Sequence, residues 1–336
     1  MQRSKLFCAI LLLCVLFAAT LPVGGESPHR IKTRAVIWRN PGRIASRDLF
    51  TGPALPSRAP VPPFKFIKED KSGESPKFRV KDARGVEWQV KLGTEAQTET
   101  VATRLLWAVG YFVEEAYYLE RVRIEGLKHL SRGNEYIIGK DVVVGARFEP
   151  RRKNVVRGPT WDWNKNPFAG TRELNGLKAL MILLNNYDAR KNNNRILIMR
   201  NGNRMEARYV VADLGATLGK ADGFGGNRSK NNLEDFLSTD FVRGVKKGVV
   251  EFDYDTRPTG LGVVSILYPP YYFGEVKKEK DMRGIPVAHA RWIGRLLAQL
   301  TDSQLRDAFR AARYDEETAD GYVRALRQRI NQLARL

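Results

Sequence analysis

The chain has 336 residues, 43% of them hydrophobic, which is enough for a sizeable core and too long for one small domain. Lysine and arginine number 57 against 37 acidic residues, and the resulting formal charge of +20 favours anionic partners. Only three histidines and two cysteines are present, which excludes a zinc cluster or an iron–sulfur site. A metal site would therefore have to use carboxylate and amide oxygens.

The N-terminus has the layout of a targeting segment. Arg3 and Lys5 precede an apolar run at residues 6–21, which is shorter than the roughly 20 residues of a stable membrane span. We predict that residues 1–25 are a signal peptide, with an uncleaved membrane anchor as the alternative. The protein is then expected to be exported to a periplasm, the extracellular space or the secretory pathway. Both cysteines lie in this segment, so the exported part would have no disulfide.

Residues 26–63 differ in composition from the rest of the chain. They contain seven of the 16 prolines and an excess of basic side chains, which is typical of an extended linker or of a strap along a domain. A tether is the simpler interpretation, although Trp38 and Phe50 offer groups that would dock it.

Alternating and helical patterns begin at Phe64. Alternation of apolar and polar residues predicts an antiparallel meander followed by a helix from Thr94 and two more strands. The expected strands are residues 64–68, 78–81, 86–92, 113–124 and 141–148.

The second half is predicted to contain more helix. A buried helix is expected at residues 171–185, and a hairpin around Asn201-Gly202-Asn203 joins strands at 195–199 and 207–212. Residues 219–285 show few strong periodicities. Residues 287–336 predict two or three amphipathic helices.

Four polar features then occur in a fixed order along the chain. Lys91 lies on a predicted strand, Glu99 lies on the next helix, Asp188 and Asn193 follow the buried helix, and Asp213-Leu-Gly follows the hairpin. Each feature alone is more often an ordinary surface or loop residue. Together they supply the groups that phosphoryl transfer requires, because that reaction depends on positioning and on charge stabilisation.

Each residue has an expected role in such a reaction. Lys91 would bind nucleotide phosphates, and Glu99 would orient that lysine, with Glu95 one turn earlier as a substitute. Asp188 would orient or deprotonate an acceptor hydroxyl. Two further roles complete the set: Arg190 would neutralise the transferring phosphate, while Asn193 and Asp213 would supply the hard oxygen ligands that magnesium prefers.

These motifs resemble those of the protein-kinase-like superfamily. The spacing from Asp188 to Asn193 is similar to the catalytic loop, Asp213-Leu-Gly resembles the metal-binding DFG element, and Val90-Lys91 resembles the nucleotide-binding strand. The match is sparse, and in this respect the chain is similar to atypical exported branches of the superfamily, such as secretory-pathway, CotH and HipA-type kinases.

The resemblance implies a fold and two cofactors. It implies an α+β, bilobal kinase-like fold, with a small antiparallel-sheet N-lobe at residues 64–148 and a mainly helical C-lobe at residues 149–336. ATP and Mg would lie between the lobes, where Lys91 and Asp213 would face each other.

The sequence also departs from the kinase pattern. The first hairpin has no GxGxxG; instead Ser72, Gly73 and Ser75 are the candidate donors for the nucleotide phosphates. Tyr187-Asp188 stands where kinases have His-Arg-Asp, and no APE-like element follows Asp213.

The expected function is transfer of the terminal phosphoryl group of Mg-ATP to a hydroxyl acceptor, either a protein or a small molecule, with acidic acceptors included. Two alternatives stay open. One is a non-catalytic nucleotide-binding module; the other is a basic surface protein that binds anionic polymer or lipid. Association with a membrane surface fits the basic final helix, and nucleic acid is not the expected partner. The motifs do not distinguish phosphoryl from nucleotidyl transfer.

Overall fold

The first half of the protein folds around a closed β-barrel. The computed structural model describes residues 33–221, 228–254, 256 and 269–336. In the barrel the strand order is β4-β3-β2-β5-β7, and β4 pairs with β7 to close the ring. The five strands are β2 (Phe64–Glu69), β3 (Lys77–Lys81), β4 (Glu87–Leu92), β5 (Tyr117–Glu125) and β7 (Val142–Pro150). A short strand, β6 (Ile137–Ile138), pairs with β7 outside the ring.

Most neighbouring strands of the barrel are antiparallel, but β2 and β5 are parallel. Their pairing joins Phe64 to Ile124 and Lys65 to Glu125. The barrel interior is filled by aromatic and branched side chains that alternate along the strands, as the pleat requires. The largest fully buried members are Phe64, Phe78, Trp88 and Phe148.

Two further sheets lie outside the barrel. One has the order β1-β10-β9-β8, and the other is a two-stranded hairpin. The first is made of β1 (Thr33–Val36), β10 (Arg204–Val211), β9 (Asn194–Asn201) and β8 (Val155–Arg157). The hairpin is made of β11 (Val242–Lys246) and β12 (Val249–Phe252).

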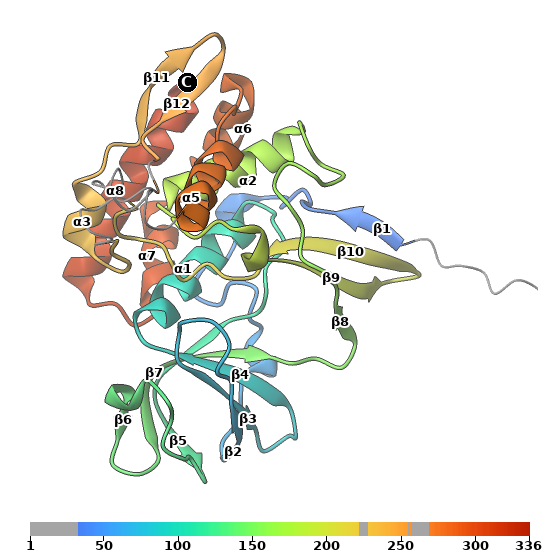
Figure 1. The fold of residues 1–336 in the computed structure, drawn as a ribbon, viewed down its shortest axis with the longest axis vertical. Helices are drawn as coiled ribbons and strands as arrows, with labels where there is room; N and C mark the ends of the chain where they lie inside the picture. The colour runs from blue at the N-terminus through green and yellow to red at the C-terminus, as the bar shows by residue number, and fades with distance from the viewer. Residues whose placement is uncertain (1–32, 222–227, 255, 257–268) are drawn as a thin grey trace, which may run out of the picture. The chain divides into compact units, whose positions relative to one another are not determined.

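The described residues form seven α-helices. They are α1 (Thr94–Ala108), α2 (Arg172–Leu183), α3 (Leu233–Leu237), α5 (Pro269–Met282), α6 (Val287–Leu297), α7 (Asp302–Arg310) and α8 (Glu316–Arg335). Helix α1 contacts β4 and β7 of the barrel on one side and α7 on the other (Figure 1). The helices and the second sheet bury one common apolar core, which includes residues of α1.

Residues 33–63, most of the predicted linker, pack against this core as a strap. Ile44 and Leu49 are fully buried, and the Trp38 indole donates a hydrogen bond to the Val109 carbonyl at 2.7 Å. The Gln304 amide of α7 donates to the carbonyl of Ile44 at 3.0 Å. Phe50, the second expected docking residue, is 45% exposed. The strap is therefore held by its aliphatic residues and by Trp38.

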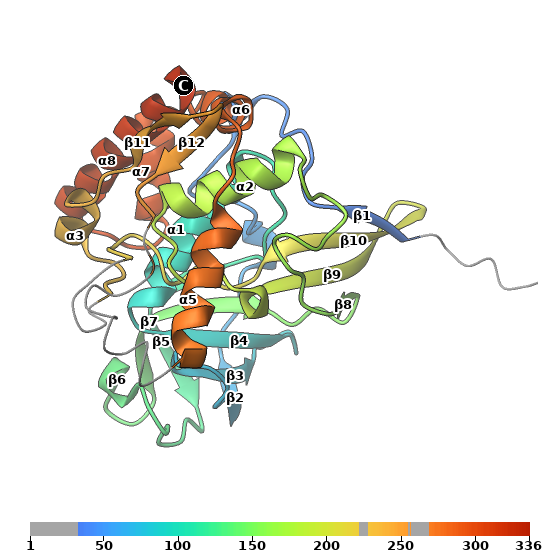
Figure 2. The ribbon, with the colours of Figure 1, turned by 45° about the horizontal axis from the view of Figure 1, so that its top comes forward.

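The predicted bilobal kinase-like fold, with a small antiparallel N-lobe sheet and a mainly helical C-lobe, is wrong. The first sheet closes into a five-stranded barrel with a parallel pair, and the second half contributes strands to two more sheets. In Figure 2 the strand β1 lies beside β10, so the start of the described chain joins a sheet from its second half. Helix α1 shares its core with the C-terminal helices. The predicted lobe pattern failed because these long-range pairings leave no local signal.

Most individual elements are confirmed. The three meander strands, α1, α2, the β9–β10 hairpin and the three C-terminal helices lie where the patterns place them, within a few residues. No helix in the described ranges has the length and apolar character to cross a membrane. The predicted signal or anchor segment, residues 1–25, lies outside the described residues.

Candidate functional site

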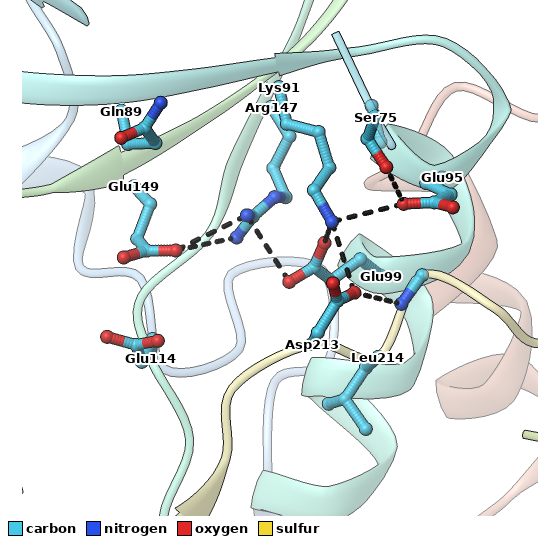
Figure 3. A network of polar contacts seen from close by, with 12 residues as sticks. Ser75, Gln89, Lys91, Glu95, Glu99, Glu114, Arg147, Glu149, Asp213 and Leu214 are labelled. Carbon is cyan, nitrogen blue, oxygen red and sulfur yellow. Dashed lines mark hydrogen bonds and ion pairs between the residues drawn. The ribbon is translucent and has the colours of Figure 1, made fainter. Parts of the chain in front are cut away.

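A buried lysine lies at the centre of the candidate site. In β4 the side chains of Trp88, Val90 and Leu92 enter the barrel core, so Lys91 lies on the opposite face of the strand. Lys91 is only 5% exposed. Figure 3 shows it pointing away from the strand toward a group of carboxylates.

Three carboxylates surround the Lys91 ammonium group. Its Nζ lies 2.9 Å from Glu99 Oε2, 3.1 Å from Asp213 Oδ1 and 3.2 Å from Glu95 Oε2. Glu95 and Glu99 are four residues apart on α1, which puts them on one face of the helix. Both the predicted partner, Glu99, and the predicted substitute, Glu95, therefore contact the lysine. We call Lys91, Glu95, Glu99 and Asp213 the lysine cluster.

A second cation extends the lysine cluster. Arg147 of β7 is paired in register with Lys91 across the sheet. Its guanidinium lies 3.2 Å from Glu99 and 3.2 Å from Glu149 (Figure 3). Glu99 is thus held between two buried cations, Lys91 and Arg147. The sequence motifs did not single out Arg147 as a site residue, although the alternation in β7 puts it on the same face of the sheet as Lys91.

Asp213 follows β10 and is fixed by the turn after it. The Gly215 amide donates to Asp213 Oδ1 at 3.2 Å, and Thr98 of α1 donates to the Gly215 carbonyl at 2.7 Å. A Cβ atom on Gly215 would lie 2.7 Å from the Cβ of Glu95, so only glycine fits this close approach. The Asp-Leu-Gly turn is therefore packed directly against the helix that carries the glutamates.

The charges of the lysine cluster change the protonation behaviour of its members. Burial alone would lower the pKa of Lys91, but the carboxylates of Glu99, Asp213 and Glu95 outweigh it and raise that pKa. Burial acts to raise the pKa of Asp213, yet Lys91 and the Gly215 amide lower it to about 2. Burial raises the pKa of Glu99 despite Arg147 and Lys91. Lys91 and Asp213 are consequently charged at neutral pH.

A second group of predicted residues forms around Asp188. The Asn193 amide donates to the Asp188 carbonyl and to its Oδ2, at 2.7 Å each. Arg190 contacts both carboxylate oxygens, with Nε 2.5 Å from Oδ1 and Nη2 2.8 Å from Oδ2. The Asn193 carbonyl accepts from the amides of Ala212 at 2.7 Å and Asp213 at 3.3 Å. Asn193 thereby joins the Asp188 group to the lysine cluster.

The candidate phosphate donors Ser72, Gly73 and Ser75 do not all lie at the lysine cluster. The Ser75 hydroxyl donates a short hydrogen bond to Glu95 and so joins the lysine cluster. Ser72 donates to Asp70 from its amide at 3.0 Å and from its hydroxyl at 2.6 Å. Gly73, with φ of +64°, lies with Ser72 in the turn between β2 and β3. Neither Ser72 nor Gly73 contacts the cluster directly.

Lys230 is a member of the site that sequence reasoning missed. Its ammonium group contacts Glu95 Oε1, so that glutamate pairs with two lysines. Lys230 belongs to a stretch without helical or strand periodicity, and no signal in the sequence marked it.

The donor set at the junction of the two groups suits magnesium. Within the described ranges, no three His, Cys, Asp or Glu side chains come together as a metal site. Asn193 uses its amide nitrogen toward Asp188, and its amide oxygen makes no hydrogen bond to any described residue. Asp213 keeps 40% of its side chain exposed. Two hard oxygen donors of this kind fit magnesium, which usually keeps several waters.

The chain matches no family model, no curated protein and no solved structure.

Proposed function

We propose that the protein transfers the terminal phosphoryl group of Mg-ATP to a hydroxyl acceptor. One observation carries this proposal: residues from four separate segments meet at one place. They are Lys91 on β4, Glu99 on α1, the pair Asp188 and Asn193 after α2, and Asp213 after β10. Their resemblance to protein-kinase-like motifs supports the proposal through these residues and not through the fold.

The lysine cluster would bind the phosphates of the nucleotide. Lys91 makes three ion pairs, and the one with Asp213 involves the most exposed of the three carboxylates. A phosphate oxygen can replace that carboxylate while Glu99 still holds the lysine in place. Asp213 and Asn193 would hold magnesium, which supplies positive charge that neutralises the phosphates.

The Asp188 group would act on the acceptor. Asp188 would accept the hydroxyl proton as the acceptor oxygen forms its bond to phosphorus and the bond from phosphorus to ADP breaks. Asn193 fixes the orientation of the Asp188 carboxylate. Arg190, whose side chain is 53% exposed, would move from Asp188 to the transferring phosphate.

One contact favours a second candidate function, which is nucleotide binding without transfer. Arg190 and Asn193 together engage both oxygens of Asp188, so neither oxygen is open to an acceptor hydroxyl. The first candidate requires Arg190 to leave. That movement is open to Arg190 because its side chain is 53% exposed and the phosphate would replace the carboxylate as its partner.

A binding experiment and a mass measurement distinguish the two functions. Thermal melting of the full chain with and without Mg-ATP reports binding, and intact mass after incubation reports a covalent phosphate. ADP release reports transfer to water or to an added acceptor. The Asp188→Ala variant should still bind Mg-ATP and lose transfer, while the control Asp141→Ala, at a partly exposed surface aspartate, should keep both.

Each outcome has a defined meaning. Binding and transfer that Asp188→Ala abolishes support the phosphotransferase. Binding with neither ADP nor a phosphorylated product supports the second candidate. No melting shift with Mg-ATP contradicts both, and full transfer by Asp188→Ala contradicts the role of that residue.

A further inference from the structure

A cavity of about 640 Å³ opens between the strap, the segment that joins α1 to β5, and the strands β7, β8, β9 and β10. Its volume lies within the range of ligand pockets, about 300–1,000 Å³. Eight arginines and three glutamates line it, so its basic side chains outnumber its acidic ones by five. None of the residues in the lysine cluster lines this cavity.

Two of these arginines, Arg47 and Arg200, have no carboxylate partner among the described residues. Arg47 donates only to the backbone carbonyls of Pro41 and Trp107. Arg200 is exposed and forms no ion pair with any residue that the structure describes. An anion would compensate the half-buried charge of Arg47, and the exposed Arg200 can turn toward the same ligand.

Other arginines of the wall have hydrogen-bond donors to spare. A guanidinium group has five N–H donors. Arg39 donates from one nitrogen to Glu206, while Arg58 and Arg152 each donate from one nitrogen to Glu115. Most N–H groups of these three arginines therefore have no partner among the described residues. They offer the forked geometry that phosphate oxygens accept.

Aromatic rings hold some of the same guanidinium groups in place. Arg39 and Arg208 lie over the Phe112 ring at 5.2 Å and 4.8 Å, and Arg47 lies over the Trp107 ring at 4.3 Å. Stacking uses the flat face of the guanidinium and leaves its N–H edge for a ligand. The cavity thus combines preorganised cations with an apolar wall, to which Leu197 also contributes.

From these contacts we propose that the cavity binds a small molecule that carries at least two phosphoryl groups. Arginine recognises phosphate by two parallel hydrogen bonds, and an excess of five basic side chains matches a ligand with more than one such group. This inference does not depend on the proposed transferase activity, because the cavity and the lysine cluster use different residues.

The acidic residue Glu114 would make this binding depend on pH. Its carboxylate contacts Arg157 and also interacts electrostatically with Glu149, Arg151 and Arg147. Burial and the negative charge of Glu149 raise the pKa of Glu114 to about 8. A neutral Glu114 favours an anionic ligand, so binding should weaken as pH rises through about 8.

Isothermal titration calorimetry of the full chain with inorganic pyrophosphate tests the proposal. We expect saturable binding, weakened at least fivefold by Arg200→Gln and at least tenfold by Arg39→Gln combined with Arg200→Gln. Arg200 is suited to this test because it is exposed and unpaired among the described residues, so its loss should not affect folding. The matched control Arg121→Gln, an exposed arginine of β5, should change the affinity less than twofold.

Three results would overturn the proposal. They are no binding of pyrophosphate at millimolar concentration, equal weakening by Arg121→Gln, and binding that Arg200→Gln and the double variant leave unchanged. The last result would place the anion elsewhere, for example at Lys91. Mg-ATP binding measured on the same variants separates this outcome from failure of the proposed transferase.

Discussion

Replacing Lys91 by methionine tests how much the ion pairs of the lysine cluster contribute to the stability of the fold. The change keeps most of the side-chain volume and removes the one cation that contacts all three carboxylates in the described part of the chain. Glu99 would keep Arg147 as a partner, and Glu95 would keep Lys230. The buried carboxylates would nevertheless lose their shared cation.

The loss of stability in Lys91→Met depends on how deeply the lysine and its carboxylate partners are buried. Removing one partner of a buried ion pair costs about 3–5 kcal/mol. The remaining cations at Glu99 and Glu95, and the 40% exposure of the Asp213 side chain, place the expected value at the lower end. We therefore expect Lys91→Met to reduce the free energy of unfolding by about 3 kcal/mol.

Urea unfolding at pH 7 measures this loss, and two variants control it. Lys71→Met removes a lysine that is 73% exposed and 4.0 Å from Glu69, and should cost less than about 0.5 kcal/mol. Adding Glu99→Gln to Lys91→Met should cost less than the sum of the single changes, by about 1–3 kcal/mol. A loss below about 1 kcal/mol for Lys91→Met, or simple additivity, would refute this account of the cluster.

Three further predictions concern other parts of the molecule. Asp213→Asn should lower stability at pH 7 by about 1 kcal/mol, a value reduced for the partial exposure of the carboxylate. The folded pKa of Asp213 is about 2, below its unfolded value, so this stabilisation is present above about pH 4 and is lost as pH falls toward 2. The urea midpoints of the natural chain and of Asp213→Asn should therefore converge at low pH. A difference that stays constant with pH would contradict the lowered pKa of Asp213. Glu114→Gln should remove the weakening of pyrophosphate binding between pH 7 and pH 9 that calorimetry should record for the natural chain, and an equal weakening in both would exclude Glu114 as its source. Gly110 has φ of +98°, and a Cβ added there would lie 2.2 Å from a carbonyl oxygen of the strap, whereas Gly42 has φ of +70° and no atom within 4 Å of an added Cβ. Gly110→Ala should therefore lower the melting temperature more than Gly42→Ala. Equal effects would mean that the strap can move to accommodate the new Cβ.

Local patterns in the sequence predicted the elements of the site well. The alternation in β4 places Lys91 opposite the barrel core, and helical spacing puts Glu95 and Glu99 on one face of α1. The five-residue spacing from Asp188 to Asn193 corresponds to a real side-chain hydrogen bond. Each of these relations spans at most five residues, where backbone geometry alone fixes the arrangement.

Most relations between distant segments could not be predicted from local patterns, and the contact of Lys91 with Asp213 was expected only through the resemblance to kinase motifs. The parallel pairing of β2 with β5 joins two barrel strands that lie about 60 residues apart in the sequence, and nothing in either strand specifies its partner. The contact of Arg147 with Glu99 depends on the register of β7 against β4. Helix α5 was missed because polar residues that are buried, such as Glu275 and Lys278, hide its periodicity.

Calorimetric titration of the full chain with ATP, in magnesium and again in EDTA, tests the central claim most directly. Asp213→Asn, which should fold at pH 7, is the matched variant. The account predicts that ATP binds the natural chain with magnesium, and that EDTA or Asp213→Asn weakens binding at least tenfold. Binding that is absent, or equally strong in EDTA and in Asp213→Asn, would contradict the assignment of this site to Mg-ATP.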